Sequence, residues 1–284
     1  IPLGAVVSIG NAMHLDLTSY LEALGRDPDC GVVLLYAESF GDVERFRAVA
    51  REVTRRKPVV ALIGGRTPPG REAAHRHTGS VALADEAAEA FCRECGILRV
   101  RSLRELKLAA KVLALYPGGA GRRILVLSNS GGPGVLATDA AMLAGLQLAT
   151  LPESFAVPLR AALPPEAAVA NPMDLLADAR EDRFSLCLEA ALAHAPAAFD
   201  QILMLHVVPF MVDAAPVIAR LATLKAGCPV PVMHAMMGTL EDRDGWFHAL
   251  EAAGIPAFGD GEDMAYAAAC LAQLADLKAH RLES

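Results

Sequence analysis

The sequence predicts two doubly wound α/β domains with mostly parallel β-sheets. Three observations support this fold class. Short β-branched runs alternate with amphipathic segments along the whole chain, which is typical of parallel sheets. The 284 residues are enough for two cores of ordinary size. A composition of 54% hydrophobic and only 5% aromatic residues indicates tight packing with many helices.

Eight short apolar runs have the composition of buried strands. They are AVVSIG (5–10), VVLLYAE (32–38), PVVALIGG (58–65), ILRV (97–100), RILVLSN (123–129), QILMLHVVP (201–209), PVPVMHAM (229–236) and IPAFG (255–259). Between them, apolar residues at three- and four-residue spacing predict helices. These cover residues 17–26, 42–56, 83–95, 103–116, 133–146, 182–195, 214–226, 243–254 and 262–282.

A domain boundary is predicted at YPGGAGRR (116–123), where proline, three glycines and two arginines precede a new strand. We therefore expect one domain over residues 1–117 and a second over residues 122–284. The chain opens with Ile and reaches a predicted strand within five residues. We expect it to be part of a longer polypeptide or one piece of a cleaved one.

Charge and composition exclude several classes of protein. A net charge of −7 argues against a nucleic-acid partner, which would be met by clustered Lys and Arg. No apolar run is long enough for a membrane helix, and the first residues lack the basic region of a signal peptide. We expect a cytoplasmic protein with no membrane partner. Cys92 and Cys95 form a lone CxxC, a weak metal signal, so we expect no metal site.

A glycine-rich turn follows the run at 123–129. Gly131, Gly132 and Gly134 surround Pro133 at the predicted first turn of a helix. Glycine lets the backbone approach a ligand closely, and the free N–H groups at a helix start favour an anion. Taken alone, the turn favours a tight strand-to-helix connection, and a phosphate cradle is the alternative.

The segment RTPPGREAAHRHTGS (66–80) predicts an irregular loop, because prolines and glycines interrupt it. His77 in this loop fits a general base, a metal ligand, a nucleophile that takes up a phosphoryl group, or a plain surface histidine.

Glu38 stands at the end of the run at 32–38. A carboxylate there can accept a proton from one imidazole nitrogen and leave the other free, although a helix cap fits Glu38 as well.

Six motifs together resemble one family. SIGN (8–11), LLYAES (34–39), KPVVALIGGRT (57–67), HTGS (77–80), SNSGGPGVLATDAA (128–141) and NPMD (171–174) occur in the order found in the NDP-forming acyl-CoA synthetases. This family is related to succinyl-CoA synthetase and includes the ADP-forming acetate–CoA ligases. The resemblance implies that both domains are flavodoxin-like. It also implies that His77, rather than His75, is the phosphohistidine and that Glu38 is its carboxylate partner.

The resemblance implies a reaction as well. A carboxylic acid, CoA and ATP give acyl-CoA, ADP and phosphate through an acyl phosphate and a phosphohistidine. CoA and ATP/ADP are then the expected substrates, with Mg²⁺ accompanying the nucleotide on an ATP-grasp domain. Implied phosphate contacts are Gly131, Gly132, Gly134, Thr78 and Gly79, and implied neighbours of the acyl or CoA group are Asn11, Asn171 and Asp174.

The family's other parts are absent from this sequence. They are the CoA-binding domain, the ATP-grasp domain and the first strand–helix unit of the histidine domain. We expect the CoA-binding domain and the ATP-grasp domain or subunit as partners, in a homo- or hetero-oligomer. One alternative is a non-catalytic, ligase-like regulatory region of a fused protein such as a lysine acetyltransferase. A flavodoxin-like cofactor binder is weaker, because the loops lack aromatic residues to cover a flavin. The presence of both His77 and Glu38 favours the enzyme.

Overall fold

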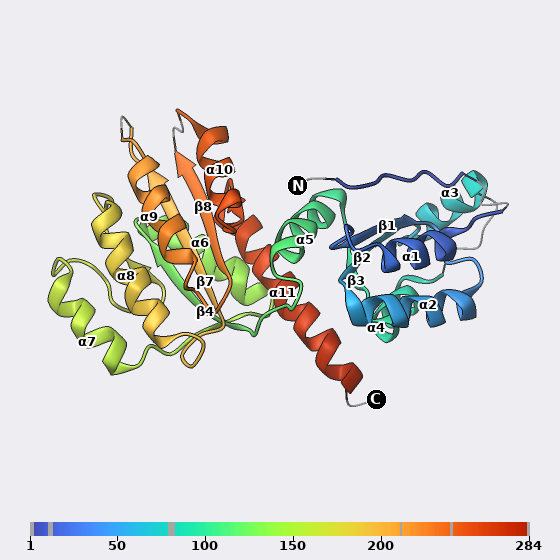
Figure 1. Ribbon diagram of the computed structural model, residues 1–284, viewed down its shortest axis with the longest axis horizontal. Helices are drawn as coiled ribbons and strands as arrows, with labels where there is room; N and C mark the ends of the chain where they lie inside the picture. The colour runs from blue at the N-terminus through green and yellow to red at the C-terminus, as the bar shows by residue number, and fades with distance from the viewer. Residues whose placement is uncertain (1–2, 11–13, 79–82, 211, 239–240, 283–284) are drawn as a thin grey trace. The chain divides into compact units, whose positions relative to one another are not determined.

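The computed structural model describes residues 3–10, 14–78, 83–210, 212–238 and 241–282 (Figure 1). The chain divides into two compact units, one of residues 1–119 with 273–284 and one of residues 120–272. Every ladder between named strands in the described residues is parallel, and the only antiparallel pairing there is an isolated bridge between Ala168 and Asp174. The predicted α/β class with parallel sheets is confirmed.

The first unit holds a three-stranded sheet in the order β1-β2-β3. Its elements are α1 (Leu17–Arg26), β1 (Val33–Ala37), α2 (Val43–Arg56), β2 (Val59–Ile63), α3 (Pro68–Thr78), α4 (Asp85–Cys95), β3 (Leu98–Val100) and α5 (Leu103–Leu115). Strand β2 is buried at all five positions because it lies between the other two. Phe40 packs against Phe46 and Phe91, with ring centroids 4.9 and 4.8 Å apart, and so joins the end of β1 to α2 and α4.

The second unit holds a larger sheet in the order β5-β4-β7-β8-β9, with β6 paired to β4 beyond the end of β5. Its elements are β4 (Arg123–Ser128), α6 (Gly131–Leu143), β5 (Gln147–Leu148), α7 (Glu153–Ala162), β6 (Met173–Asp174), α8 (Glu181–His194), β7 (Gln201–Val208), α9 (Ala215–Lys225), β8 (Val232–Gly238), α10 (Arg243–Ala252), β9 (Ala257–Phe258) and the first part of α11 (Gly261–Leu282), whose residues from 273 on belong to the first unit. With β6 left aside, the order is second-first-third-fourth-fifth, which is the flavodoxin-like order of doubly wound sheets.

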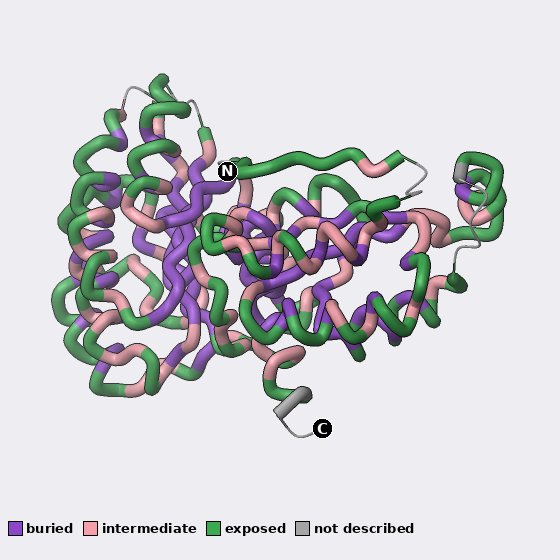
Figure 2. Tube along the Cα trace, turned by 45° about the vertical axis from the view of Figure 1, so that its right-hand side comes forward, coloured by how far each residue is buried: buried purple, intermediate pink, exposed green. Residues whose placement is uncertain are grey.

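Helices cover both faces of this second sheet. The residues of β4 and β7 are almost all buried, as the purple strands in Figure 2 show. One face packs into a cluster that includes Phe155, Phe184 and Trp246 from α7, α8 and α10. On α11, a Cβ at Gly261 would come within 2.8 Å of Ala137 Cβ and 2.9 Å of Leu205 Cδ2, so α6, β7 and α11 meet closely there. Burial on both faces explains why these strands read as continuous apolar runs.

The predicted strand at residues 5–10 is wrong. Residues 3–10 form no strand, and Val6 and Val7 are 81% and 43% exposed. Figure 2 draws most of this segment in green. β-Branched composition gives a residue only a preference for extended backbone, whereas a strand also needs a neighbouring strand to receive its hydrogen bonds. No described strand pairs with this segment.

The predicted loop at residues 66–80 is also wrong over most of its length, because residues 68–78 form α3. Prolines are tolerated in the first helical turn, where their missing N–H would have no intrahelical acceptor. Thr67 holds this turn together: its Oγ1 accepts from Gly70 N at 3.2 Å, and its carbonyl accepts from Arg71 N at 2.8 Å. Here the prolines begin a helix instead of preventing one.

Three short elements were not predicted. Strands β5 and β6 have two residues each, too few to show a period. Helix α7 contains Pro158, which interrupts the helical pattern in the sequence. It forms nonetheless, because Phe155 and Leu159 on one face are buried in the core.

Candidate active site

Glu38 follows the last residue of β1, at the carboxyl edge of the first sheet. In doubly wound sheets this edge is where ligands bind. The Glu38 side chain is only 15% exposed. Its Oε1 accepts a hydrogen bond from the Tyr36 hydroxyl at 3.4 Å, because residues two apart on a strand point to the same face. The pKa of the Tyr36 hydroxyl is raised, first by its desolvation and then by the negative charge of Glu38, so Tyr36 remains a donor.

A pair of glycines carries the chain from β2 toward α3. Gly64 N donates to Ala37 O at 2.8 Å, which extends the β1–β2 ladder by one bond. A Cβ at Gly64 would lie 3.4 Å from Glu38 Cγ, so this residue packs directly against the carboxylate side chain. Gly65 has φ of +77°, a left-handed conformation that favours glycine. A Cβ at Gly70, in the first turn of α3, would lie 3.6 Å from Gly65 Cα, so the helix begins directly against this turn.

His77 lies in the last turn of α3, and its ring reaches Glu38. The distance between His77 Nδ1 and Glu38 Oε2 is 3.2 Å, and the His77 side chain is 75% exposed. His75 is two residues earlier on the same helix, which places it about 200° away around the helix axis. Only His77 therefore meets the carboxylate, and His75 is exposed elsewhere on α3.

The contact determines which His77 nitrogen is available for chemistry. An ionised carboxylate only accepts hydrogen bonds, so Nδ1 carries the proton in the 3.2 Å contact. In the neutral ring, Nε2 then holds the lone pair. No described residue is hydrogen-bonded to Nε2. This arrangement can present a nucleophilic nitrogen to solvent while the carboxylate stabilises the positive charge that forms on the ring.

A partly buried ion-pair cluster joins the residues just before α3 to the start of α4. Arg66, just before α3, binds Asp85 at the start of α4 through two contacts of 3.1 Å. Arg99 on β3, whose side chain is 4% exposed, binds the same carboxylate at 2.5 Å. The Arg66 hydrogen bond, with a further contribution from Arg99, lowers the pKa of Asp85. Arg66 thus has an internal partner, which the sequence did not reveal.

In the second unit, hydrogen bonds from the side chains of Ser128 and Asn129 fix the backbone at the end of β4. Asn129 is 1% exposed; its amide nitrogen donates to Val207 O at 2.9 Å, and its Oδ1 accepts from Val207 N at 2.7 Å. Ser128 Oγ donates to Ser130 O at 2.7 Å and accepts from Ser130 N at 3.1 Å. These bonds hold the backbone rigidly just before the glycine-rich helix start.

The three glycines of α6 have different surroundings. A Cβ at Gly131 would lie 3.3 Å from Asp174 Oδ2, and one at Gly134 would lie 3.5 Å from Ser128 Cβ. A Cβ at Gly132 would meet nothing within 4 Å. No side chain caps the helix at Ser130, and the first N–H groups of a helix have no intrahelical acceptor. The start of α6 therefore has the donors and the open space that an anion requires.

Asn171 is bound to the backbone of the second sheet. Asn171 Oδ1 accepts from Val126 N at 3.0 Å, and its Nδ2 donates to Ile124 O and Ala149 O at 2.8 and 3.0 Å. These bonds to the backbone of the sheet occupy its carboxamide, so the structure does not support the expected substrate contact by Asn171.

Asp174 instead borders Gly131, and its Oδ1 accepts from Leu176 N at 3.0 Å. Leu176 has φ of +69°, a strained conformation for a bulky residue and one found more often at functional sites. Of the remaining predicted site residues, Thr78 is the last residue of α3, and Asn11 and Gly79 lie outside the described residues.

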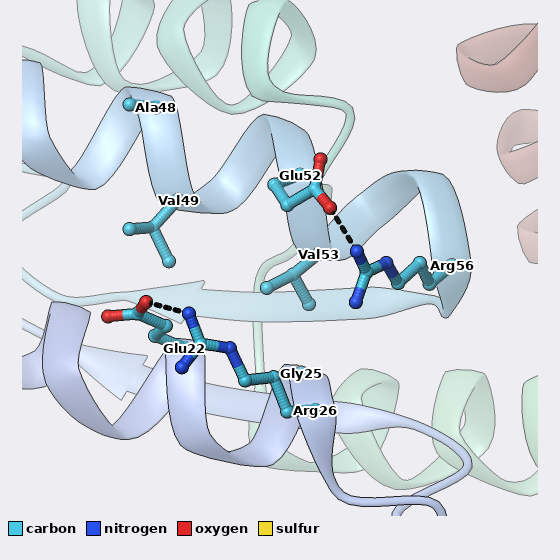
Figure 3. Close-up of a pocket in the computed structure, with 8 residues that line it drawn as sticks. All are labelled: Glu22, Gly25, Arg26, Ala48, Val49, Glu52, Val53 and Arg56. Atoms are coloured by element: carbon cyan, nitrogen blue, oxygen red, sulfur yellow. Dashed lines mark hydrogen bonds and ion pairs between the residues drawn. The ribbon is translucent and has the colours of Figure 1, made fainter.

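A separate groove of about 270 Å³ lies between α1 and α2 (Figure 3). Its walls carry the intrahelical ion pairs Glu22–Arg26 and Glu52–Arg56. A Cβ at Gly25 would overlap the Val53 side chain, so glycine permits the close helix contact. The groove lies toward the C-terminal ends of both helices, which lead into the amino ends of β1 and β2. It is therefore at the edge of the sheet opposite Glu38.

Metal and membrane features are not found among the described residues. They contain no group of three or more His, Cys, Asp or Glu side chains placed to hold a metal ion. Cys92 and Cys95 are buried thiols, and burial raises the pKa of Cys92 to about 12, which keeps it protonated and unreactive. Within the described chain, no helix combines the length and apolar character needed to cross a bilayer.

Comparisons with known proteins identify the class of this chain. Residues 1–113 match the model of a succinyl-CoA ligase like flavodoxin domain, and residues 124–269 match that of a Ligase-CoA domain. Its two units are therefore CoA-ligase domains. The chain belongs to the NDP-forming acyl-CoA synthetases, the family that includes the ADP-forming acetate–CoA ligases, as its motifs predicted.

Individual relatives agree with this assignment. The alpha subunit of acetate–CoA ligase [ADP-forming] II from Pyrococcus furiosus is 35% identical over 276 residues, which are 95% of this chain and 59% of that protein. The 4-hydroxybutyrate–CoA ligase [ADP-forming] of Nitrosopumilus maritimus is 32% identical over 196 residues, 68% of this chain and 28% of that protein.

A solved structure is similar over almost the full chain. It is the dinucleotide forming acetyl-coenzyme A synthetase 1 of Ca. Korarchaeum cryptofilum in complex with phosphate and ADP, with a TM-score of 0.88 and 30% identity. The match covers 98% of this chain and 60% of that one. This chain thus spans less than two thirds of the length of these relatives.

Proposed function

We propose that this chain is the phosphoryl-carrying part of an ADP-forming acid–thiol ligase, which converts a carboxylic acid, CoA and ATP to acyl-CoA, ADP and phosphate. The observation that carries the proposal is the 3.2 Å contact between His77 Nδ1 and Glu38, made by a ring that is 75% exposed. A phosphoryl carrier needs one nitrogen held by an acid and the other open to solvent. A non-catalytic regulatory region would need neither feature.

In the proposed reaction, His77 Nε2 attacks the γ-phosphorus of ATP. The P–N bond forms as the bond to the β-phosphate oxygen breaks, and ADP leaves. The carboxylate of the acid then attacks the phosphohistidine, which gives an acyl phosphate and restores the ring. Finally the CoA sulfur bonds to the acyl carbon as the bond from that carbon to the phosphate oxygen breaks, and the leaving phosphate takes the thiol proton. Glu38 accepts the Nδ1–H hydrogen bond throughout and stabilises the ring while it carries charge.

Gly132 is the proposed centre of the phosphate site in the second unit, with Gly131 and Gly134 as further contacts. In the first unit, Thr78 and Gly79, next to His77 in the sequence, are proposed contacts of the phosphoryl group. The exposed backbone at the start of α6 offers N–H groups and the positive end of the helix dipole. Asp174 lies on the Gly131 side, where its negative charge would repel phosphate. We therefore place the anion on the open Gly132 side and assign Asp174 to the acyl or CoA side.

The proposed enzyme needs parts from outside this sequence. These are a CoA-binding domain and an ATP-grasp domain that binds ATP/ADP with Mg²⁺, on the same polypeptide or on another subunit. We place the histidine domain at residues 1–117 and the second domain at residues 122–284. We also propose that a strand from outside this sequence completes the first sheet. Two observations support it: the exposed apolar residues Val6 and Val7, and the edge position of β1.

The test uses acetyl phosphate labelled with ³²P as the phosphoryl donor, because it requires no nucleotide-binding domain. Unchanged chain, His77→Asn and the matched control His75→Asn are incubated with the donor, and acid-labile, base-stable protein label is counted. Both histidines are exposed residues of α3, so both variants should fold alike. We expect label on the unchanged chain and on His75→Asn, and none on His77→Asn.

A second arm uses the full-length protein with its nucleotide-binding part and ATP labelled at the γ-phosphate. Label that survives His77→Asn in either arm, or that is lost in His75→Asn, would refute the assignment of His77.

A further inference from the structure

Ser154 and His194 form a hydrogen-bonded pair that the proposed phosphoryl transfer does not use. Ser154 is in the first turn of α7, and His194 is the last residue of α8. Ser154 Oγ is 3.1 Å from His194 Nε2. The other ring nitrogen, Nδ1, is 2.8 Å from the carbonyl oxygen of Ala190. A hydroxyl, an imidazole and a third group that orients the imidazole are the parts of an activated serine nucleophile.

The backbone partner determines the direction of both hydrogen bonds. A carbonyl oxygen can only accept, so His194 Nδ1 carries the proton and donates to Ala190 O. In the neutral ring, Nε2 is then an acceptor, and the Ser154 hydroxyl must donate to it. This is the tautomer that a general base needs in order to remove the serine proton.

The surroundings hold the imidazole and leave the serine open. The buried Phe155 ring packs edge-on against His194 with centroids 5.5 Å apart, which restricts rotation of the imidazole. Ser154 itself is exposed. No side chain caps α7 at Pro152, so the first N–H groups of the helix face outward at the end that carries Ser154. Such donors stabilise the oxyanion that forms when a hydroxyl attacks a carbonyl carbon.

Two neighbours indicate which substrate would fit. Val157 is three residues after Ser154, on the same face of α7, and is 53% exposed, so it offers an apolar contact. Glu153 is adjacent to Ser154 in the sequence. Arg160 binds the Glu153 carboxylate at 3.2 Å, but the Glu153 side chain remains 76% exposed. A negative charge beside the serine disfavours anionic acyl donors such as acyl phosphates.

We propose that Ser154 is a nucleophile toward small, uncharged, activated carboxylic esters, with His194 as its general base. Ser154 Oγ forms a bond to the ester carbonyl carbon while its proton passes to His194 Nε2. The bond to the leaving alcohol then breaks, and the alkoxide takes that proton. Water next attacks the acyl-serine through the same base, which releases the carboxylic acid and restores the hydroxyl.

The test uses p-nitrophenyl acetate with the full chain. Release of p-nitrophenol is followed by absorbance, and the position of the acetyl group is mapped by peptide mass spectrometry in acid-quenched samples. The variants are Ser154→Ala, His194→Gln and the control His248→Gln, which removes another exposed histidine of the same unit. Circular dichroism verifies that each variant is folded.

We expect the rate to fall at least about tenfold in Ser154→Ala and His194→Gln, since positioned general bases contribute this much or more. We expect no change in His248→Gln, which separates this activity from the loss of a surface histidine in general. Acetylation should map to Ser154. An unchanged rate in Ser154→Ala, or acetyl groups found only on other residues, would overturn the proposal.

Discussion

The two units place their candidate chemistry at opposite ends of a helix. In the first unit the reactive group is a side chain, His77, in the last turn of α3, and Glu38 at the end of β1 holds it. In the second unit the useful groups are backbone N–H donors at the first turn of α6, directly after β4. A side chain at a helix end can extend into solvent, whereas backbone donors stay where the strand places them. The first arrangement suits a carrier and the second a receiving site.

The histidines of the two units show the same contrast. His77 is exposed and has a carboxylate partner, whereas His206 and His234, on neighbouring strands β7 and β8, are 1% and 0% exposed. Their rings lie 5.7 Å apart, and among the described residues His206 Nδ1 and both nitrogens of His234 lack a hydrogen-bond partner. Burial, mainly, lowers the pKa of His206 to about 4 and that of His234 to about 3. The same side chain is a candidate reactive group in one unit and a neutral core residue in the other.

The largest expected effect tests the role of the carboxylate in the first unit. Glu38→Gln keeps the size of the side chain but removes the charge that stabilises the His77 ring. We expect histidine phosphorylation by acetyl phosphate to slow about 100-fold, the lower range for a positioned acid–base partner. The matched control is Glu72→Gln, which removes an exposed carboxylate of α3. Equal phosphorylation rates for Glu38→Gln and the unchanged chain would show that Glu38 does not take part in the reaction of His77.

The next effect concerns the buried histidines of the second unit. Because their folded-state pKa values lie below the ordinary 6.5, the unfolded chain binds protons first as the pH falls. Their contribution to stability is complete above pH 6.5 and is lost as the pH falls from 6.5 toward 4. At about pH 5, we expect protonation linked to each histidine to lower the free energy of unfolding by about 2 kcal/mol relative to its value at pH 7.

Urea denaturation between pH 7 and 5 measures this loss. His234→Leu should reduce the pH dependence by about half, because one of two protons no longer binds on unfolding. His248→Gln, at an exposed site, should leave it unchanged. A stability that does not change over this range would contradict the neutral, buried state of the pair.

A smaller effect separates the two exposed glycines of the α6 turn. Alanine at position 132 meets no atom within 4 Å, so Gly132→Ala should raise the free energy of unfolding by about 0.5 kcal/mol. The Cβ of an alanine at position 131 would lie 3.3 Å from Asp174 Oδ2, so Gly131→Ala should not raise the free energy of unfolding. Acyl-CoA synthesis by the complete enzyme should nevertheless fall more in Gly132→Ala, because the methyl group occupies the proposed anion position.

Denaturant melts and a thioester assay on both variants make this comparison. Phosphate would have to bind on the Asp174 side if Gly131→Ala lost more activity than Gly132→Ala while remaining equally stable.

The smallest effect concerns Tyr36. Its hydroxyl donates to Glu38 at 3.4 Å, a long and therefore weak hydrogen bond. We expect Tyr36→Phe to slow His77 phosphorylation by about threefold, which corresponds to the low end of a single hydrogen bond. Rapid-quench measurement with labelled acetyl phosphate resolves a change of this size. A loss as large as that of Glu38→Gln would show that Tyr36 acts as more than a support of the carboxylate.

Much of the fold follows from local pattern. Strands β2, β4, β7 and β8 are buried on both faces or nearly so, and burial selects the continuous apolar runs that the sequence displays. Glu38 and His77 were selected as a pair because the motifs resemble those of a family. The spacing of 39 residues between them has no local meaning, and the close contact depends on the parallel pairing of β1 with β2.

Other features required neighbours that local pattern does not contain. Arg66 stands in a segment that predicts a loop, where a cation would be free, yet it binds the carboxylate of Asp85, which Arg99 also binds. Asn171 stands in a turn-like motif, yet three backbone groups of the sheet region use its carboxamide. Tyr36 was overlooked, although its position two residues before Glu38 on a strand was a usable signal.

The sequence by itself determined the alternation of strands and helices, the glycine-rich start of α6 and the identity of the family, because periodicity and motif order are properties of the chain alone. Only the tertiary structure decided that residues 68–78 are helical, that Nδ1 is the His77 nitrogen that meets Glu38, and that His206 and His234 are buried in the core. The physical reason is that exposure, ion pairing and the protonated nitrogen of a ring depend on atoms far away in the sequence, which folding alone brings within a few ångströms.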